Sequence, residues 1–258
     1  MTKPRLVVAS IAAGVLALSA FAQAEVIQRG HIRVSFEGKL TPHVLPRHGT
    51  APIRVAVGAK IDPTDSGSPP QLRRISISIN RNGRFEPNGL PVCRLNQIQP
   101  STTEGALEAC RGSLVGQGQF SAKVLLSEQA PFPSDGRIYA FNGRVGGRPA
   151  ILAHVYGSKP IPTSTTLPFV ITRSKGTFGT VLRASLPRVT GKWGYVTGLT
   201  MTLGRSFVYR GRRHSYLSAG CPAPAGFPGA VFPLVRASFS FDKRTLSKTL
   251  VRSCQARG

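Results

Sequence analysis

Apolar and polar residues alternate along most of the chain, which is the pattern of β-strands that bury one face. The clearest case is residues 72–79, where isoleucines at every second position share one face and arginine and serine take the other. The same alternation predicts about a dozen strands in all. The others are residues 31–40, 53–61, 114–126, 137–145, 148–156, 166–172, 178–186, 199–203, 206–210, 214–217, 235–242 and 246–251.

Glycine, proline and asparagine separate these segments and predict turns. Asn82-Gly83 favours a type I′ turn after the strand 72–79. Gly146-Gly147 predicts a hairpin, and the prolines of residues 131–136 predict another turn. Many strands with frequent turns indicate an all-β fold, and the alternating faces favour an antiparallel β-sandwich.

One short helix is predicted between Cys93 and Cys110. Ser101 and Glu104 have the spacing of a capping box, and Gly112 is well placed to end the helix. A helix of this length is not stable alone. A disulfide between the two cysteines would fix it in place, contributing about 3 kcal/mol in the chain-entropy model.

The chain contains four cysteines, which allow three pairings. Pairing near neighbours favours Cys93 with Cys110 and Cys221 with Cys254. The second disulfide would tie the last strand to the loop before the preceding strand. A metal or redox pair is the alternative, but no further cysteine or histidine lies nearby at ligand spacing.

Residues 1–24 have the features of a secretory signal peptide. Lys3 and Arg5 precede an apolar core, and Ala22 and Ala24 form an A-x-A cleavage site. The alternative is an uncleaved membrane anchor. Cleavage would leave residues 25–258 as a single β-sandwich domain, with a possible sub-division near 158–166. No later segment is long and apolar enough for a membrane helix. The predicted location is outside the cytosol, either extracellular or in the cell envelope, where disulfides persist.

The chain carries 34 lysines and arginines against 10 acidic residues, a formal charge of +24. Loss of Lys3 and Arg5 with the signal peptide leaves 32 − 10 = +22. Such a charge attracts polyanions: anionic wall polymers, acidic polysaccharides, nucleic acid or anionic lipid heads. The alternative is compositional, because an excess of arginine over lysine also follows from a GC-rich genome.

Two arginine groups are candidate anion-binding sites. The first follows the strand 199–203 and interleaves arginine with aromatic residues, which could stack on bases or sugars: Arg205, Tyr209, Arg210, Arg212 and Arg213, with Phe207 and Tyr216. The second is Arg144 and Arg148, which flank the Gly146-Gly147 turn. The alternatives are an edge hairpin protected by charge, and a plain turn. Trp193 and Tyr195 could form a sugar platform or a core anchor.

No motif for a metalloprotease, serine hydrolase, P-loop or CxxC redox site occurs in the sequence. Capping and turn formation explain the closely spaced acidic pairs better than glycosidase chemistry does. His43 and His48 are close in sequence but have no nearby acidic or thiol partner. No catalytic residue, metal site or cofactor is therefore predicted. A hydrolase with His154 or His214 as its base is the alternative, because triad members need not be adjacent in sequence.

Four segments resemble a family of secreted, β-rich proteins of unknown function from soil actinobacteria. They are residues 80–93 (NRNGRFEPNGLPVC), 110–118 (CRGSLVGQG), 175–182 (KGTFGTVL) and 221–227 (CPAPAGF). The resemblance covers most of the chain after residue 24. It implies export but no activity, cofactor or catalytic residue. The expected function is binding of anionic polymer at the cell envelope, without catalysis.

Overall fold

The computed structural model describes residues 24–65, 70–99, 101–125, 130–159, 162–186 and 194–257. The predicted signal peptide up to residue 23, Leu126 and Trp193 therefore lie outside the described residues. Within those ranges strands dominate, and the predicted all-β class is confirmed.

The described residues form eighteen strands, several more than the sequence predicted. The first nine are β1 (Glu25–Arg29), β2 (Ile32–Thr41), β3 (Val44–Pro46), β4 (Ala51–Pro52), β5 (Arg54–Pro63), β6 (Leu72–Asn80), β7 (Gly83–Phe85), β8 (Leu114–Val124) and β9 (Phe132–Val145). The other nine are β10 (Arg148–Gly157), β11 (Thr163–Arg173), β12 (Phe178–Ser185), β13 (Gly194–Leu203), β14 (Ser206–Tyr209), β15 (Arg212–Ser215), β16 (Leu217–Ala219), β17 (Gly229–Phe241) and β18 (Thr245–Arg257).

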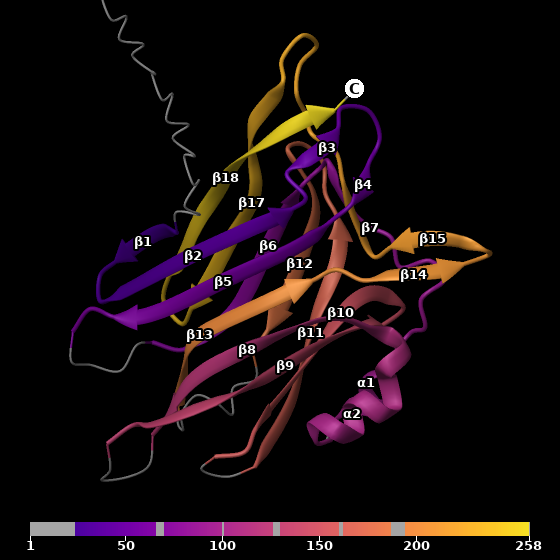
Figure 1. Ribbon diagram of the computed structural model, residues 1–258. Helices are drawn as coiled ribbons and strands as arrows, with labels where there is room; N and C mark the ends of the chain where they lie inside the picture. The colour runs from indigo at the N-terminus through magenta and orange to yellow at the C-terminus, as the bar shows by residue number, and fades with distance from the viewer. Residues whose placement is uncertain are drawn as a thin grey trace, which may run out of the picture.

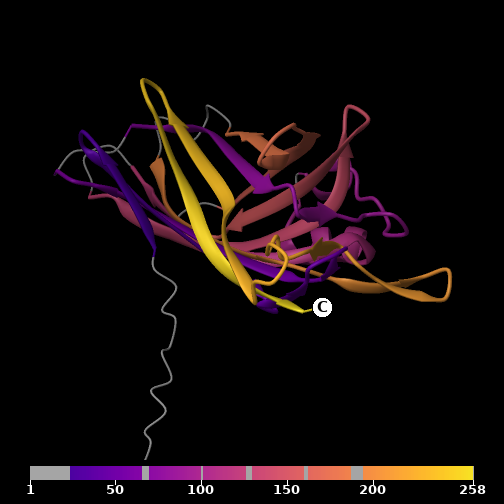
Figure 2. The same ribbon diagram turned by 90° about the horizontal axis from the view of Figure 1, so that it is seen from above.

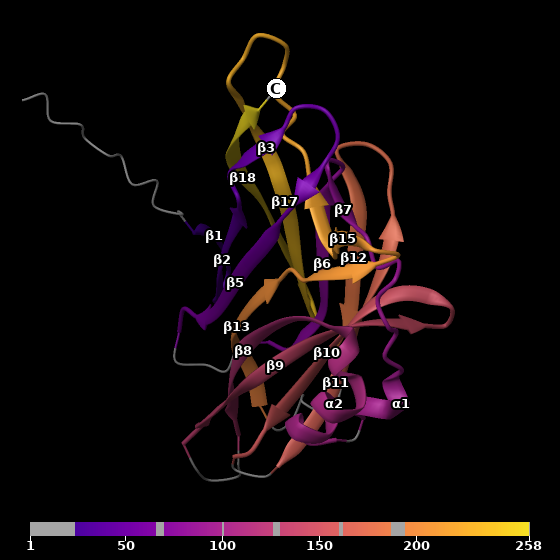
Figure 3. The ribbon, with the colours of Figure 1, turned by 45° about the vertical axis from the view of Figure 1, so that its right-hand side comes forward.

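Thirteen strands belong to one sheet, in the order β1-β2-β5-β13-β8-β9-β10-β11-β12-β6-β17-β18-β3. Its neighbouring strands are antiparallel, except that β18 and β3 run parallel. Two small sheets, β14-β15 and β4-β16-β7, lie beside it. Figures 1 and 3 show the large sheet curling, so that β17 and β18 come to face β2 and β5.

The core fills the space that the curled sheet encloses. Ile32, Val34 and Phe36 of β2 pack with Phe239 of β17 and Leu250 of β18 in one cluster. A second cluster extends this core toward β16 and the Cys221–Cys254 disulfide. The alternating burial of β2 follows the alternation in its sequence, because inward side chains contact the opposite layer while outward ones contact water.

Side chains join β18 to β2 where the curled sheet closes. A Cβ atom on Gly38 would lie 2.7 Å from Cδ2 of Leu250, so the missing side chain lets Leu250 pack against β2. Nε of Arg252 donates to the Gly38 carbonyl at 3.1 Å. Lys248 and Glu25 form an ion pair at 3.5 Å across the same gap. The closure therefore combines apolar packing with charged contacts at its rim.

Helices cover the outer face of β9 and β10. They are α1 (Leu95–Ile98), α2 (Thr103–Cys110) and the 3-10 turn η1 (Arg111–Ser113), and only α2 was predicted. The amide of Gly105 donates to the Thr102 hydroxyl at 3.2 Å. The helix cap is therefore Thr102, one residue after the predicted Ser101. Beneath the helices, Phe141 and Leu152 are fully buried, so β9 and β10 have two buried faces.

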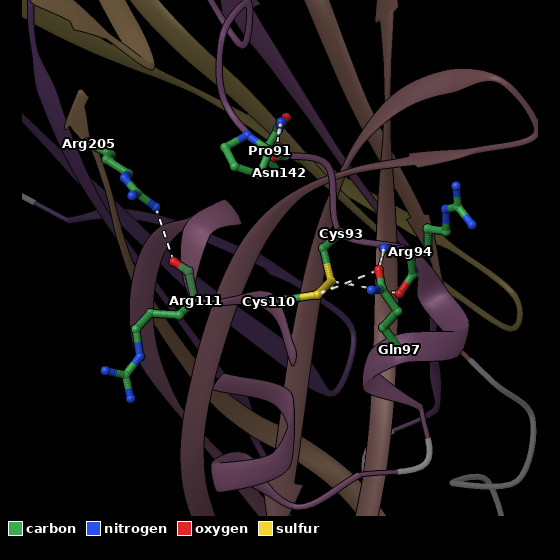
Figure 4. Close-up of a disulfide and its surroundings, with 8 residues drawn as sticks. All are labelled: Pro91, Cys93, Arg94, Gln97, Cys110, Arg111, Asn142 and Arg205. Carbon is green, nitrogen blue, oxygen red and sulfur yellow. Dashed lines mark hydrogen bonds between the residues drawn. A yellow bond between two sulfur atoms is a disulfide. The ribbon is translucent and has the colours of Figure 1, made fainter. Parts of the chain in front are cut away.

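Both predicted disulfides are present, Cys93–Cys110 and Cys221–Cys254. The first ties the segment before α1 to the end of α2 (Figure 4). That segment is also bonded to β9, because the Cys93 amide donates to the Asn142 carbonyl at 2.9 Å and the Asn142 side chain donates to the Pro91 carbonyl at 3.0 Å. The disulfide therefore holds the helical layer on the sheet.

Two predicted turns were wrong. Asn82-Gly83 does not form a type I′ turn, because Gly83 lacks a positive φ and β7 pairs with β16 instead of returning along β6. The side chain of Asn80 accepts the Asn82 amide at 3.0 Å and directs the chain out of the large sheet. Residues 131–136 are mostly strand, since β9 begins at Phe132 and pairs there with the end of β8.

The closure predicts opposite results for two adjacent residues of β18. Leu250 is fully buried against β2, so Leu250→Ala should lower the free energy of unfolding by about 2–5 kcal/mol. Val251 is 43% exposed, so Val251→Ala should change it by about 0.5 kcal/mol or less. Urea denaturation measures both values. Equal effects would contradict the packing of β18 against β2.

Candidate functional site

The first predicted arginine group lies largely on the β14-β15 hairpin, which the sequence predicted around Gly211. The hairpin forms a two-stranded sheet of its own and projects from the body of the molecule (Figures 1 and 2). Its turn contains Arg210 and Gly211, with φ values of 51° and 73°. Arg210 is the only residue other than glycine with a positive φ in the described part of the chain, although this backbone conformation costs arginine free energy.

Aromatic side chains cover one face of the hairpin. The rings of Phe207 and His214 stack at 5.8 Å, and Tyr209 meets His214 edge-on at 5.9 Å. The guanidinium carbon of Arg210 lies 5.2 Å from the centre of the Tyr209 ring, a cation–π contact. Tyr209 also packs on Gly89, where an added Cβ would lie 2.3 Å from the ring. These contacts position the tip of the hairpin and its arginines.

The hairpin arginines lack acidic partners. The ion pairs between described residues join His31 to Asp65, Lys60 to Asp62, Arg73 to Asp242 and Lys248 to Glu25. Arg210, Arg212 and Arg213 take part in none of them. Register places Arg212 opposite Tyr209 on the aromatic face, and Arg213 opposite the exposed Val208 on the other face. The hairpin therefore presents positive charge on both faces and at its tip.

Arg205, which the sequence grouped with these arginines, has contacts of another kind. Its NH1 atom donates to the carbonyls of Arg111, Gly112 and Leu114 at 3.2, 2.8 and 2.8 Å. Figure 4 shows Arg205 reaching the carbonyl of Arg111 at the end of the helical layer. The guanidinium group thus bonds carbonyls of η1 and at the start of β8. We assign Arg205 to supporting the base of the hairpin.

Tyr216, also named with the hairpin from sequence, is fully buried. Its ring packs edge-on against Phe85 at 5.7 Å, inside the core. Burial raises the pKa of its hydroxyl, which has no hydrogen-bond partner among the described residues. Tyr216 is therefore a core residue that anchors the chain after the hairpin.

The second predicted group, Arg144 and Arg148, flanks the turn between β9 and β10. The turn is the predicted hairpin, with positive φ at Gly146 and Gly147. NH1 of Arg144 donates to the Gly147 carbonyl at 3.4 Å. Both arginines are exposed, but they belong to a different sheet from β14-β15. The two arginine groups are therefore separate surfaces, and the second has no aromatic face in the described structure.

The histidines that the hydrolase alternative requires lack catalytic partners. His154 is fully buried on β10 beneath α1, and neither ring nitrogen has a hydrogen-bond partner within the described residues. Burial lowers the pKa of His154, although the nearby Ile98 backbone favours the protonated ring. The ring contacts of His214 are with Phe207 and Tyr209. Neither histidine bonds a hydroxyl or carboxylate in this part of the chain, so the described geometry offers no support for a triad.

The described residues also provide no group of three or more His, Cys, Asp or Glu side chains that could hold a metal ion. His43 and His48 flank β3 and are exposed. Tyr195 lies on β13, opposite Lys123 on β8. Its proposed sugar-platform partner, Trp193, lies outside the described residues.

A shallow hollow of about 330 Å³ lies on the outer face of β2, β5, β13 and β8. Glycines at its centre, Gly58 and Gly198, are flanked by polar side chains that include Glu37, Lys60 and Gln119. No local pattern in the sequence indicates this hollow. It arises only because β13 pairs between β5 and β8 and brings distant glycines together. The Glu37 carboxylate can accept hydrogen bonds there and the Gln119 amide can donate and accept them, but a single carboxylate does not form a glycosidase pair.

No protein-family model, curated protein or solved structure matches this chain. The resemblance to secreted actinobacterial proteins therefore stays a prediction. Among the described helices, none is long and apolar enough to cross a membrane.

Burial of His154 predicts a loss of stability in mild acid. The unfolded chain binds a proton near pH 6.5, whereas the folded protein resists protonation because the pKa of His154 is lowered. Stability should therefore fall as the pH drops below about 6.5, by at most about 1.4 kcal/mol per pH unit from this residue. Urea denaturation from pH 7.5 to 5 should show a weaker pH dependence for His154→Leu. Parallel profiles for both proteins would contradict this assignment.

Proposed function

We propose that the protein is an exported, non-enzymatic binding protein that holds an anionic polymer of the cell envelope. The contact surface is the β14-β15 hairpin, with Arg210, Arg212 and Arg213. The observation that carries the proposal is that Arg210 and Arg212 project beside aromatic rings and Arg213 from the other face, all without acidic partners among the described residues. Export rests on the predicted signal peptide and is supported by the two disulfides.

The hairpin chemistry fits a flexible chain of anionic units. Guanidinium groups bind phosphate and carboxylate groups through paired hydrogen bonds. The partly exposed Tyr209 ring adds stacking surface for sugars between the charges. Charge on both faces and at the tip allows a linear polymer to wrap the hairpin, whereas a small anion would need converging donors in a pocket. An acidic polysaccharide or a phosphate-bearing wall polymer is therefore favoured.

The rest of the molecule supports this role without competing for it. The predicted chain after signal-peptide cleavage carries +22, which attracts polyanions from a distance. The ion pairs at the ends of β1, β5 and β6 reduce local charge away from the hairpin. Long-range attraction would bring the polymer near, and the hairpin would then determine where it is held.

A charge-matched pair of variants tests this surface. The triple variant Arg210→Gln, Arg212→Gln, Arg213→Gln removes three charges from the hairpin. We expect its affinity for heparin and for glycerol-phosphate teichoic acid to fall roughly tenfold or more, and the slope of log affinity against log salt to fall by roughly 2–3. Salt-dependent binding to the immobilised polymers measures both quantities.

The matched control removes three arginines from the outer face of β6, β12 and β17: Arg74, Arg183 and Arg236, each changed to Gln. This control should retain most of the affinity, because it changes the net charge equally but leaves the hairpin intact. Equal weakening by both triples would show diffuse attraction and overturn the hairpin as the site. Elution of the parent protein at low salt would overturn polyanion binding, and preference for nucleic acid over both polysaccharides would change the polymer class.

A further inference from the structure

An apolar loop lies at the opposite extremity from the α1-α2 layer. It joins β16 to β17, with Cys221 at its start, and projects beside the C-terminus at the top of Figures 1 and 3. The chain carries no charged residue from position 217 to 235. Phe227 is 61% exposed at this loop, and Pro222, Pro224, Ala225 and Pro228 are exposed beside it.

Several carbonyls of this loop accept hydrogen bonds from within the protein. Arg47 donates to the carbonyls of Ala223, at 3.1 Å, of Phe227, at 2.7 Å, and of Pro224. The carbonyl of Pro228 accepts the Ala256 amide at 2.8 Å. The Cys221–Cys254 disulfide ties the base of the loop to β18. Internal hydrogen bonds lower the cost of moving the loop into a medium with little water.

Exposed valines lie on the strands next to the loop. Val231 on β17, Val251 on β18 and Val44 on β3 are 75%, 43% and 43% exposed. Register places Val231 opposite Ser253 and Val44 opposite Gln255, on neighbouring strands of the same outer face. With Phe227, these residues form what we term the apolar end. A cluster of exposed large apolar side chains marks an interaction surface.

The charges around the apolar end have one sign. Arg257 is exposed at the end of β18, near β3 and the exposed side chains of His43 and His48. Residues 38–61, 217–241 and 243–257, which supply the apolar end and its neighbours, include no acidic residue. A second copy of the chain would bring like charges together across a symmetric contact. A surface with an apolar interior and anionic heads complements both features.

We propose that the apolar end docks on the surface of a bilayer that contains anionic lipids. Phe227 and Val231 enter the boundary between head groups and acyl chains, while His43, His48 and Arg257 face the anionic heads. The Arg47 hydrogen bonds and the disulfide hold the loop in this orientation. This surface is separate from the β14-β15 hairpin, and docking would leave the hairpin available for polymer.

Insertion can be measured at residue 227 itself. The chain contains a single tryptophan, Trp193, so Trp193→Phe gives a background in which Phe227→Trp reports its own surroundings. With phosphatidylglycerol–phosphatidylcholine vesicles, Trp at 227 should shift its emission to the blue and be quenched by brominated acyl chains. The matched probe is Val208→Trp on the hairpin, where the valine is more exposed than Phe227. Its emission should neither shift to the blue nor be quenched by the brominated chains.

Co-sedimentation with the same vesicles tests the contribution of the apolar end. Phe227→Ser with Val231→Ser should weaken partitioning roughly tenfold or more. Val208→Ser should retain it, as should the hairpin triple arginine variant. Pure phosphatidylcholine vesicles should bind the parent protein far less. Thermal denaturation checks that the exposed substitutions leave the fold intact.

Three outcomes would overturn the proposal. An unshifted Phe227→Trp spectrum on anionic vesicles would mean that the loop does not insert. Loss of vesicle binding in the hairpin triple alone would mean that arginines, and not the apolar end, attract the protein. A concentration-dependent dimer that Phe227→Ser abolishes would assign the apolar end to self-association. The hairpin proposal would survive the first and third results.

Discussion

Closure of the curled sheet is the constraint on which the rest of the structure depends. A sheet of this width must bury its inner face, and it does so by bringing β17 and β18 over β2 and β5. Leu250 reaches the surface of β2 because Gly38 has no side chain, and Arg252 bonds the carbonyl exposed there. Without this contact, apolar residues on both layers would face water.

The same closure determines where charged side chains can lie in the structure. Inward positions are filled with apolar side chains, so lysines and arginines occupy outward positions, rims and turns. At the rim, Lys248 and Arg73 find acidic partners. On the hairpin, Arg210, Arg212 and Arg213 are exposed and take part in no ion pair between described residues. Most described lysines and arginines lack an acidic partner, and those of the hairpin differ in lying on a two-stranded sheet that projects from the body of the molecule.

Arginine serves three physical purposes in this protein. Arg47 and Arg205 satisfy carbonyls that irregular backbone leaves without partners. Arg210 and Arg236 lie over the rings of Tyr209 and Phe178. Arg212, on the hairpin, makes neither kind of contact with the described residues, so its guanidinium group is available to a ligand. Each of these arginines contributes equally to the net charge. Their hydrogen-bond and ring contacts distinguish the structural arginines from those available to a ligand.

The sequence by itself determined the all-β class, most strand positions, the hairpin around Gly211 and the two disulfides. These features are local, because alternation with period two and turn residues act over a few positions, and the pairing of near cysteines needs only a short loop. Helix α2 was also found, since its cap and apolar residues lie within one short segment. The turn after β6 was wrong because Asn80 bonds locally while Gly83 pairs with a distant strand.

Only the tertiary structure decided how the strands are ordered and which residues become neighbours. The pairing of β13 with β5, and of β6 with β17, joins segments more than a hundred residues apart. That order separates Arg205 and Tyr216 from the hairpin surface, buries His154 under α1, and gathers Phe227, Val231 and Val44 at one end. Local patterns cannot specify such contacts, because each strand could bury its apolar face against any other.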